Sequence, residues 1–244
     1  MNFGQSFLDV HRESLAFAVA CPFLFAVPVL AEFAQHVVEM QAGMYDGIEG
    51  AQAAENDPLR LWFGVAKVVL ITVPTYWMVR FLHSRRDTGF ARKWEPRAVR
   101  LFAAVLALQL LVVLLSLFVF PPNDAMGLGF LGFSVIFPPL IARFMAAAPL
   151  GIWISPQASI RTMTRHFVFA LAFWIAAILP LLVLHYVLAG IAIAVTGEAG
   201  DWAVMAIDSL VTGLLSLVTA AALWVVATRA GPLGGTLEAP RGEA

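Results

Sequence analysis

Long uncharged stretches separated by short polar connections dominate the hydrophobic pattern of the chain. A membrane-spanning helix needs about 20 mostly apolar residues, because it rises ~1.5 Å per residue across a hydrocarbon core ~30 Å thick. Six segments meet this requirement, so the pattern predicts an all-α polytopic bundle of six transmembrane helices. The expected spans are residues 14–36, 61–82, 101–120, 128–150, 167–195 and 202–228.

Composition supports a membrane protein and excludes several other classes. Of the 244 residues, 61% are hydrophobic and 13% charged, whereas about 25% of a soluble domain is charged. The net charge of −1 provides no global field for attracting nucleic acid, and no nucleic-acid partner is expected. A single cysteine, Cys21, excludes an intrachain disulfide and a cysteine-based zinc site.

The distribution of basic residues predicts the orientation. Twelve of the fifteen lysines and arginines fall before the first span, after the last, or in the second-to-third and fourth-to-fifth connections. The other connections are acidic, with Arg60 as their one basic residue. The positive-inside rule therefore predicts that both termini are cytoplasmic. The expected organisation is one transmembrane domain, residues 1–230, followed by a disordered cytoplasmic tail, residues 231–244, that is rich in Gly, Pro and Ala.

Ionisable residues inside spans are costly and usually face the protein interior, which makes each one a candidate site residue. The rise per residue places four such groups, on four helices, in the outer third of the bundle. On the last span Asp208 begins a polar stripe that continues along one helix face. The sequence thus predicts an outward-facing polar pocket with these candidates: Glu32, Lys67, His185, Asp208, Thr212 and Ser216.

Each of these residues also has a less specific interpretation. Glu32, His36 and Glu39 lie at i, i+4 and i+7 on one helix face, where they can ligate a metal or simply mark the point at which the helix leaves the bilayer. The latter is the prediction, so no metal site is expected. Lys67 can extend its amine along its own stem to the interface, or it can form a structural ion pair with Asp208.

Basic residues near the cytoplasmic face are candidates for contact with lipid headgroups. Arg143 lies deeper, and it either extends to the cytoplasmic headgroups or turns inward to bind a lipid phosphate or a carboxylate. Nearby prolines, Pro138 and Pro139, predict a kinked helix with freed carbonyl groups. The candidate headgroup residues are Arg143, Arg85, Arg86, Arg92, Lys93, Arg161 and Arg165.

Residues 141–166 carry a family resemblance. The stretch has an arginine in a span (Arg143), a proline six residues later (Pro149), and a short loop containing Ser159 and Thr164 before the next span. It resembles the membrane-embedded domain attached to some glycerophosphoryl diester phosphodiesterases, and that domain's stand-alone bacterial relatives. Met163 stands where that family often has Trp. The resemblance implies a bacterial inner-membrane protein associated with lipid or envelope function, and it brings no hydrolase activity because the catalytic barrel is absent.

No catalytic constellation and no cofactor motif emerges from the sequence, so no enzyme activity is predicted. The first functional hypothesis is a scaffold or accessory subunit of a membrane complex, with membrane lipids and other membrane-protein subunits as partners. The second is a transporter or lipid-handling protein that uses the outward-facing pocket. The third is a metal-dependent membrane enzyme that uses Glu32, His36 and Glu39.

Overall fold

A computed structural model describes residues 2–121, 124–194 and 197–233, and this part of the chain is helical with no β-strand. The all-α prediction is confirmed. From residue 234 onward, the predicted tail lies outside the described residues.

The first span begins later than the hydrophobic pattern predicts. α1 (Phe3–Ala20) ends before Cys21, and α2 (Pro22–Gln41) starts with proline in its first turn. Proline has no amide hydrogen to continue the preceding helix, so the chain breaks here. The residues from Ser14 to Cys21 therefore do not form the start of the span. One face of α1 is buried and includes Val10, Ser14 and Phe17. α1 packs against the final helix.

The second span is assembled from two helices. α4 (Pro58–Thr72) and α5 (Thr75–His83) follow one another with a short break at Val73 and Pro74, and together they form a candidate span, Pro58–His83. The short helix α3 (Gly47–Ala54) precedes α4, and α6 (Thr88–Arg92) follows α5.

The segments predicted as the third and fourth spans form a helical hairpin. α7 (Pro96–Leu114) continues into a π-helical turn, η1 (Leu115–Val119). α8 (Ala125–Leu140), α9 (Ala142–Ala147) and the 3₁₀ turn η2 (Ala148–Leu150) return as a pair of helices bent by 53°. The predicted kink therefore exists, and it lies just after the two consecutive prolines of α8.

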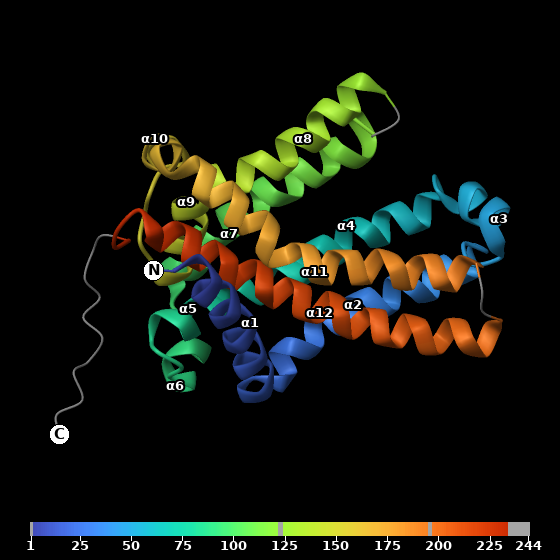
Figure 1. Cartoon of the computed structure of the whole chain (residues 1–244), viewed down its shortest axis with the longest axis horizontal. Helices are drawn as coiled ribbons and strands as arrows, with labels where there is room; N and C mark the ends of the chain where they lie inside the picture. Colours follow the sequence, from blue (N-terminus) through green and yellow to red (C-terminus); the bar gives the residue numbers. More distant parts are fainter. Residues whose placement is uncertain (1, 122–123, 195–196, 234–244) are drawn as a thin grey trace.

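The last two spans are the longest. α10 (Pro156–Met163) and the 3₁₀ turn η3 (Thr164–His166) lead into α11 (Phe167–Ala194), which contains Pro180 and changes direction part-way along its length (Figure 1). α12 (Glu198–Arg229) runs back beside α11 and contacts α1, α2, α5 and α9.

Five helices of the described chain are long and apolar enough to cross a membrane, and a sixth qualifies if the bent pair of α8 and α9 counts as one span. The start of α1 and the end of α12 lie at the same end of the molecule, together with α6 and α10 (Figure 1). We call this the basic end because it holds Arg85, Arg86, Arg92, Lys93, Arg161 and Arg165. The opposite end, with α3, is the acidic end, named for Asp46, Glu49, Glu55 and Asp57.

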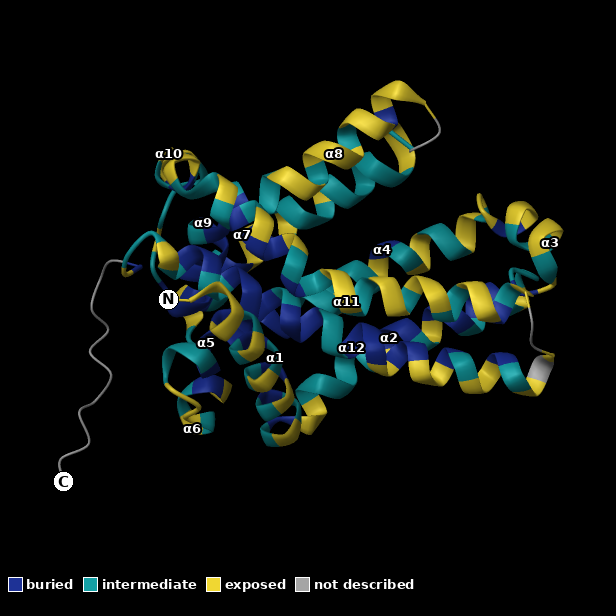
Figure 2. Cartoon of the chain, in the orientation of Figure 1, coloured by how far each residue is buried: buried dark blue, intermediate teal, exposed yellow. Residues whose placement is uncertain are grey.

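Burial concentrates along α12. The helices α1, α5 and α9 contact α12 and contain the buried residues Phe17, Met78 and Phe144. By contrast, α8 and much of α11 expose apolar side chains (Figure 2). A large exposed apolar surface is unfavourable in water, but it is stable when lipid surrounds it. It therefore agrees with a membrane protein.

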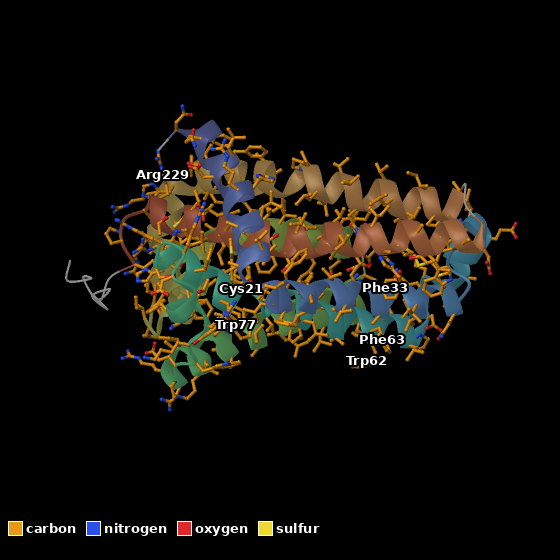
Figure 3. All side chains as sticks on the ribbon, turned by 90° about the horizontal axis from the view of Figure 1, so that it is seen from below. Cys21, Phe33, Trp62, Phe63, Trp77 and Arg229 are labelled. Atoms are coloured by element: carbon orange, nitrogen blue, oxygen red, sulfur yellow. The ribbon has the colours of Figure 1, made fainter. Side chains whose placement is uncertain are left out.

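Exposed tryptophans occur near both ends of the molecule. Trp94 follows α6 and Trp153 precedes α10, both near the basic end. Trp202 lies in the first turns of α12, and Trp62 lies in the early turns of α4, towards the acidic end (Figure 3). Tryptophan is enriched at membrane–water interfaces because its ring is apolar and its N–H is polar. This arrangement is typical of helices that cross a bilayer.

Candidate functional site

Four of the six predicted pocket residues, together with His36, meet between α2, α4, α11 and α12 in the half of the bundle nearer the acidic end. Glu32 and His36 come from α2, Lys67 from α4, His185 from α11 and Asp208 from α12. We call these five residues the acid–histidine cluster. Its two carboxylate side chains are almost fully buried: Glu32 is 1% exposed and Asp208 is 0% exposed. Burying an ionised group that has no partner costs on the order of tens of kcal/mol. These two carboxylates therefore need partners inside the protein.

His36 lies at the centre of the cluster. Its Nε2 is 3.0 Å from Oδ2 of Asp208 and 3.4 Å from Oε1 of Glu32. Its Nδ1 is 3.1 Å from Oε2 of Glu39 and 2.9 Å from the Tyr45 hydroxyl. Both ring nitrogens thus face oxygen atoms, so the imidazole is held in one orientation by groups on two helices and a loop.

The predicted ion pair between Lys67 and Asp208 is wrong. Lys67 Nζ lies 3.2 Å from Oε1 of Glu32, whereas both oxygens of Asp208 are 2.9 Å from Nδ1 of His185. The reason is the packing order of the helices. α4 lies against α2, and α11 lies against α12, so each acid meets the base on its own neighbour.

Glu32, His36 and Glu39 are more than polar groups at the exposed end of a helix. All three are buried and face the interior of the bundle. Lys67 does not extend freely to the interface either, since its amine is held by Glu32, although 22% of its side chain remains exposed.

One glycine allows the helices to come close enough for these contacts. A β-carbon at Gly213 of α12 would lie 2.5 Å from Val29 and 2.9 Å from Phe25, both on α2. Such distances are far below van der Waals contact, so only glycine fits at this crossing. Gly213 follows Asp208 by five residues, and the close approach brings Asp208 within reach of His36.

A second polar layer lies on the acidic-end side of the cluster. Glu39 accepts hydrogen bonds from Arg60 Nε at 3.1 Å and from the Gln35 amide at 3.0 Å through Oε1, and from the Tyr45 hydroxyl at 2.8 Å through Oε2. Burial and the adjacent Glu39 carboxylate raise the pKa of the Tyr45 phenol above its usual range, so Tyr45 remains a donor. The sequence analysis missed Gln35 and Tyr45, because a neutral amide or phenol near a helix end carries no distinctive signal.

The remaining two predicted pocket residues are only partly joined to this network. Thr212 Oγ1 lies 3.3 Å from Nδ1 of His185, at the edge of the cluster. Ser216, one turn further along α12, instead donates a 2.5 Å hydrogen bond to the carbonyl of Ile71, beside the break between α4 and α5. Ser216 thus ties α12 to the backbone of α4 just before the break.

The charges of the buried network do not balance when its carboxyl groups are ionised. Glu32, Glu39 and Asp208 supply three negative charges, whereas Arg60 and Lys67 supply two positive ones. His36 and His185 are neutral or cationic according to their protonation. The network therefore lacks one positive charge, which a proton on a histidine supplies.

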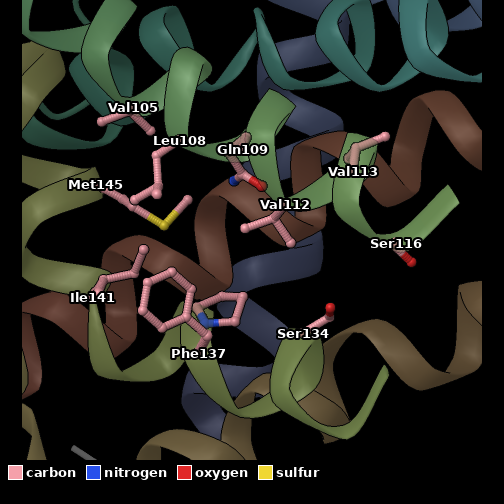
Figure 4. A pocket seen from close by; sticks show the side chains of 11 residues that line it. Val105, Leu108, Gln109, Val112, Val113, Ser116, Ser134, Phe137, Ile141 and Met145 are labelled. Carbon is pink, nitrogen blue, oxygen red and sulfur yellow. The ribbon is translucent and has the colours of Figure 1, made fainter. Parts of the chain in front are cut away.

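Three cavities lie among the helices of the bundle, and Lys67 of the cluster lines one of them. The outer cavity, about 330 Å³, lies between α2, α4 and the α7–η1 segment, and Gln35, Glu39, Arg60 and Lys67 line it. The central cavity, about 250 Å³, is lined by Thr212 and Ser216 among mostly apolar residues. The hairpin cavity, about 230 Å³, lies between α7, α8 and α9 (Figure 4). The predicted polar pocket is thus not a single cavity. Lys67 lines the outer cavity and Thr212 lines the central one, whereas Glu32 and Asp208 are buried.

Shared lining residues link the three cavities. Val68 borders both the outer and the central cavity. Gln109 borders both the central and the hairpin cavity, and Val113 borders both the hairpin and the outer cavity (Figure 4). Gln109 is a further polar group in the middle of a span, and the sequence analysis did not single it out.

Arg143 turns towards the backbone of the chain and forms no ion pair with a carboxylate among the described residues. Its guanidinium group donates to backbone carbonyls at the end of α12: Ala227 at 3.0 Å, Gly231 at 2.8 Å and Pro232 at 2.7 Å. The last carbonyls of a helix have no intrahelical donor. Arg143 therefore caps α12, and its contact with a lipid headgroup stays a prediction.

The other six candidate headgroup residues lie together at the basic end, where all of them are exposed. Arg86 forms a two-bond ion pair with Glu13, at 2.9 and 2.7 Å, and Arg92 donates to the carbonyl of Ala20 at 2.6 Å. These contacts hold the loop that contains α6 against α1. Arg161 and Arg165 extend from α10 and η3 nearby.

Arg80 is the most deeply buried arginine of the described chain, at 1% exposure, and the sequence analysis counted it only as a loop charge. It donates to the carbonyl of Phe90 through Nε at 3.3 Å and Nη2 at 3.1 Å, and to the carbonyl of Pro149 through Nη1 at 3.0 Å. It also lies over the Phe90 ring, with its guanidinium carbon 4.4 Å from the ring centroid. Arg80 thus fastens the α6 loop to η2.

No protein-family model, no curated protein and no solved structure matches this chain. The resemblance of residues 141–166 to the phosphodiesterase membrane domain therefore stays a prediction.

Proposed function

We propose that this chain is a lipid-handling membrane protein that binds an amphipathic anionic molecule in its three adjoining cavities. The observation that carries the proposal is the change in character along these cavities. The outer cavity is lined by the cations Arg60 and Lys67 beside the Glu39 carboxylate, whereas the hairpin cavity is lined mostly by apolar side chains. A polar head with a negative charge fits the first, and an acyl chain fits the second.

The arrangement of the helices supports entry from the side. The hairpin of α7 and α8 points away from α4 and α11 towards the acidic end (Figure 1), and the hairpin cavity lies at its base, where α9 begins. Binding cavities of about 300–1,000 Å³ are typical for small ligands, and the three volumes fall in or just below that range. Gln109, at the junction of two cavities, offers an amide for a polar group such as an ester.

The proposed location is a bacterial inner membrane, with six spans and the basic end in the cytoplasm. The clustering of Arg85, Arg86, Arg92, Lys93, Arg161 and Arg165 at one end supports this orientation through the positive-inside rule. The six exposed cations also suit contact with anionic headgroups. A reporter active only in the cytoplasm, fused to either terminus, tests the orientation.

Native mass spectrometry of the full chain, extracted gently from its own membrane, tests lipid binding. We expect a retained lipid in the wild type and its loss in Val113→Trp, because an indole at position 113 fills the junction of the outer and hairpin cavities. The matched control is Leu111→Trp on the same helix, where the side chain is 52% exposed. Retention of the lipid by the control alone supports the proposal.

Two results count against lipid handling. Wild-type protein that carries no lipid, or equal retention by both tryptophan variants, contradicts the proposal. A protein partner that co-purifies at fixed stoichiometry with the wild type and with Val113→Trp supports instead the scaffold or accessory-subunit role expected from the sequence.

A further inference from the structure

We propose that Glu32, His36 and Asp208 form a binding site for a divalent transition-metal ion. Each residue offers one ligand atom, and these three atoms lie within 4.8 Å of one another. The site differs from the Glu32–His36–Glu39 stripe considered from the sequence, because its third ligand comes from α12. It does not depend on lipid entering the cavities.

The spacing of the donor atoms suits a metal ion. Nε2 of His36 lies 3.0 Å from Oδ2 of Asp208 and 3.4 Å from Oε1 of Glu32. Ligand atoms about 2.0–2.2 Å from a tetrahedral zinc ion are separated by roughly 3.4 Å. The observed separations therefore need only small side-chain rotations to enclose a cation.

A second observation, independent of the clustering, points to a missing ligand. Oε2 of Glu32 is buried and has no hydrogen-bond partner among the described residues, although the side chain is 99% buried. A buried carboxylate oxygen without a partner costs about 1–3 kcal/mol or more. A cation bound beside Glu32 removes this cost.

Surrounding residues already orient the three ligands. Nδ1 of His36 faces Oε2 of Glu39 at 3.1 Å, which leaves Nε2 free to coordinate when the proton is on Nδ1. A histidine held between a carboxylate and a metal is a recurring arrangement, because the hydrogen bond fixes the ring and its tautomer. His185 holds Asp208 in the same way from the other side, at 2.9 Å.

Lys67 adjusts the charge of the site. With a divalent cation present, the three carboxylates of the network are balanced by the metal and Arg60 alone. Lys67 then adds an unneeded positive charge 3.2 Å from Glu32. Its flexible side chain also lines the outer cavity, so the amine has space to move away from Glu32 when the metal enters.

The donor set selects the class of metal. One imidazole nitrogen and two carboxylate oxygens suit Zn²⁺, Mn²⁺, Fe²⁺ or Co²⁺, whereas Mg²⁺ and Ca²⁺ prefer oxygen ligands alone. The protein supplies three ligands, so at least one coordination position remains for water or for another group.

The test is titration of the full-length protein in detergent with Zn²⁺ and Co²⁺ after treatment with a chelator. We expect one ion per chain, and Co²⁺ should give the visible absorption of a low-symmetry site with a nitrogen ligand. Mg²⁺ at the same concentration should not displace it. Wild-type protein that binds no Zn²⁺ or Co²⁺ beyond the level of a chain with both Asp208→Asn and His36→Gln overturns the proposal.

Single variants locate the site. His36→Gln and Glu32→Gln should each weaken Zn²⁺ binding about 100-fold, since each removes a ligand, and Glu39→Gln about 10-fold, through lost orientation of His36. His83→Gln, which removes a histidine near the basic end, is the matched control. Ion binding that survives His36→Gln and Glu32→Gln unchanged shows that the metal binds elsewhere and overturns the assignment.

Lys67→Met keeps the proposal testable if loss of a ligand unfolds the protein. Removing the competing amine should strengthen Zn²⁺ binding about tenfold, whereas Lys93→Met, at the exposed basic end, should leave it unchanged. If Lys67→Met binds Zn²⁺ no more tightly than Lys93→Met does, the ion is not beside Glu32.

Discussion

His36 Nε2 and Asp208 Oδ2 lie 3.0 Å apart, although 172 positions separate the two residues in the chain. α2 and α12 cross closely at Gly213, and this contact joins the two ends of the sequence in one buried site. The ion-binding and lipid-binding proposals both require α2 to remain in place against α12.

Substituting Gly213 tests this close approach. Gly213→Ala should destabilise the protein by about 1–3 kcal/mol, because the added carbon overlaps Val29 and Phe25 and forces the helices apart. Gly190→Ala, in α11 with nothing within 4 Å of the added carbon, is the control and should be neutral or slightly stabilising. Thermal unfolding followed by tryptophan fluorescence measures both. Equal melting temperatures for the two variants would mean that α2 and α12 are not tightly packed.

Replacing Arg80 with lysine should also reduce stability, although the charge is kept. A lysine amine cannot reproduce the guanidinium contacts with the carbonyls of Phe90 and Pro149. We expect a loss of about 1.5–3 kcal/mol, the range for hydrogen bonds to charged groups. Arg97→Lys, at an exposed position in α7, should leave the melting temperature unchanged. An equally stable Arg80→Lys protein contradicts the anchoring role.

Arg143→Gln separates helix capping from lipid contact. Loss of its three carbonyl bonds should loosen the end of α12, which hydrogen exchange detects as faster exchange of the backbone amides near residues 227–231. Arg161→Gln, an exposed cation nearby, is the control and should leave exchange unchanged. Weaker binding to anionic vesicles with unchanged exchange would support the headgroup assignment for Arg143.

Ser159→Ala tests the break in the fourth span. The Ser159 hydroxyl donates to the carbonyl of Leu140 at 3.0 Å and accepts from the amides of Arg143 and Phe144 at 3.2 and 3.3 Å. Removing it leaves these buried groups unpaired, at a cost of about 1–3 kcal/mol. Ser134→Ala serves as the control in a chemical-denaturation series, because the Ser134 hydroxyl bonds only within its own helix. An equal loss in both variants would mean that Ser159 does not hold the break.

The sequence by itself determined the class of the protein and most of its helix positions. Apolar stretches of sufficient length must be covered by lipid or protein, and that requirement is local, so it can be read from the chain directly. The start of the first span was misplaced most, because the pattern stayed apolar across Cys21 while Pro22 interrupted the helix. The sequence also identified Glu32, Lys67, His185 and Asp208 as polar groups at similar depth.

Tertiary structure alone decided which of these groups touch. Depth follows from the rise per residue, but pairing depends on which helices are neighbours and on how each is rotated about its axis. Because α4 packs against α2, Lys67 contacts Glu32. Because Gly213 lets α12 approach α2 closely, Asp208 contacts His36. The same reason explains Arg143, whose partners are backbone carbonyls that no side-chain pattern reveals. Side-chain identity fixes what a group can bind, and the packing of distant helices fixes what it meets.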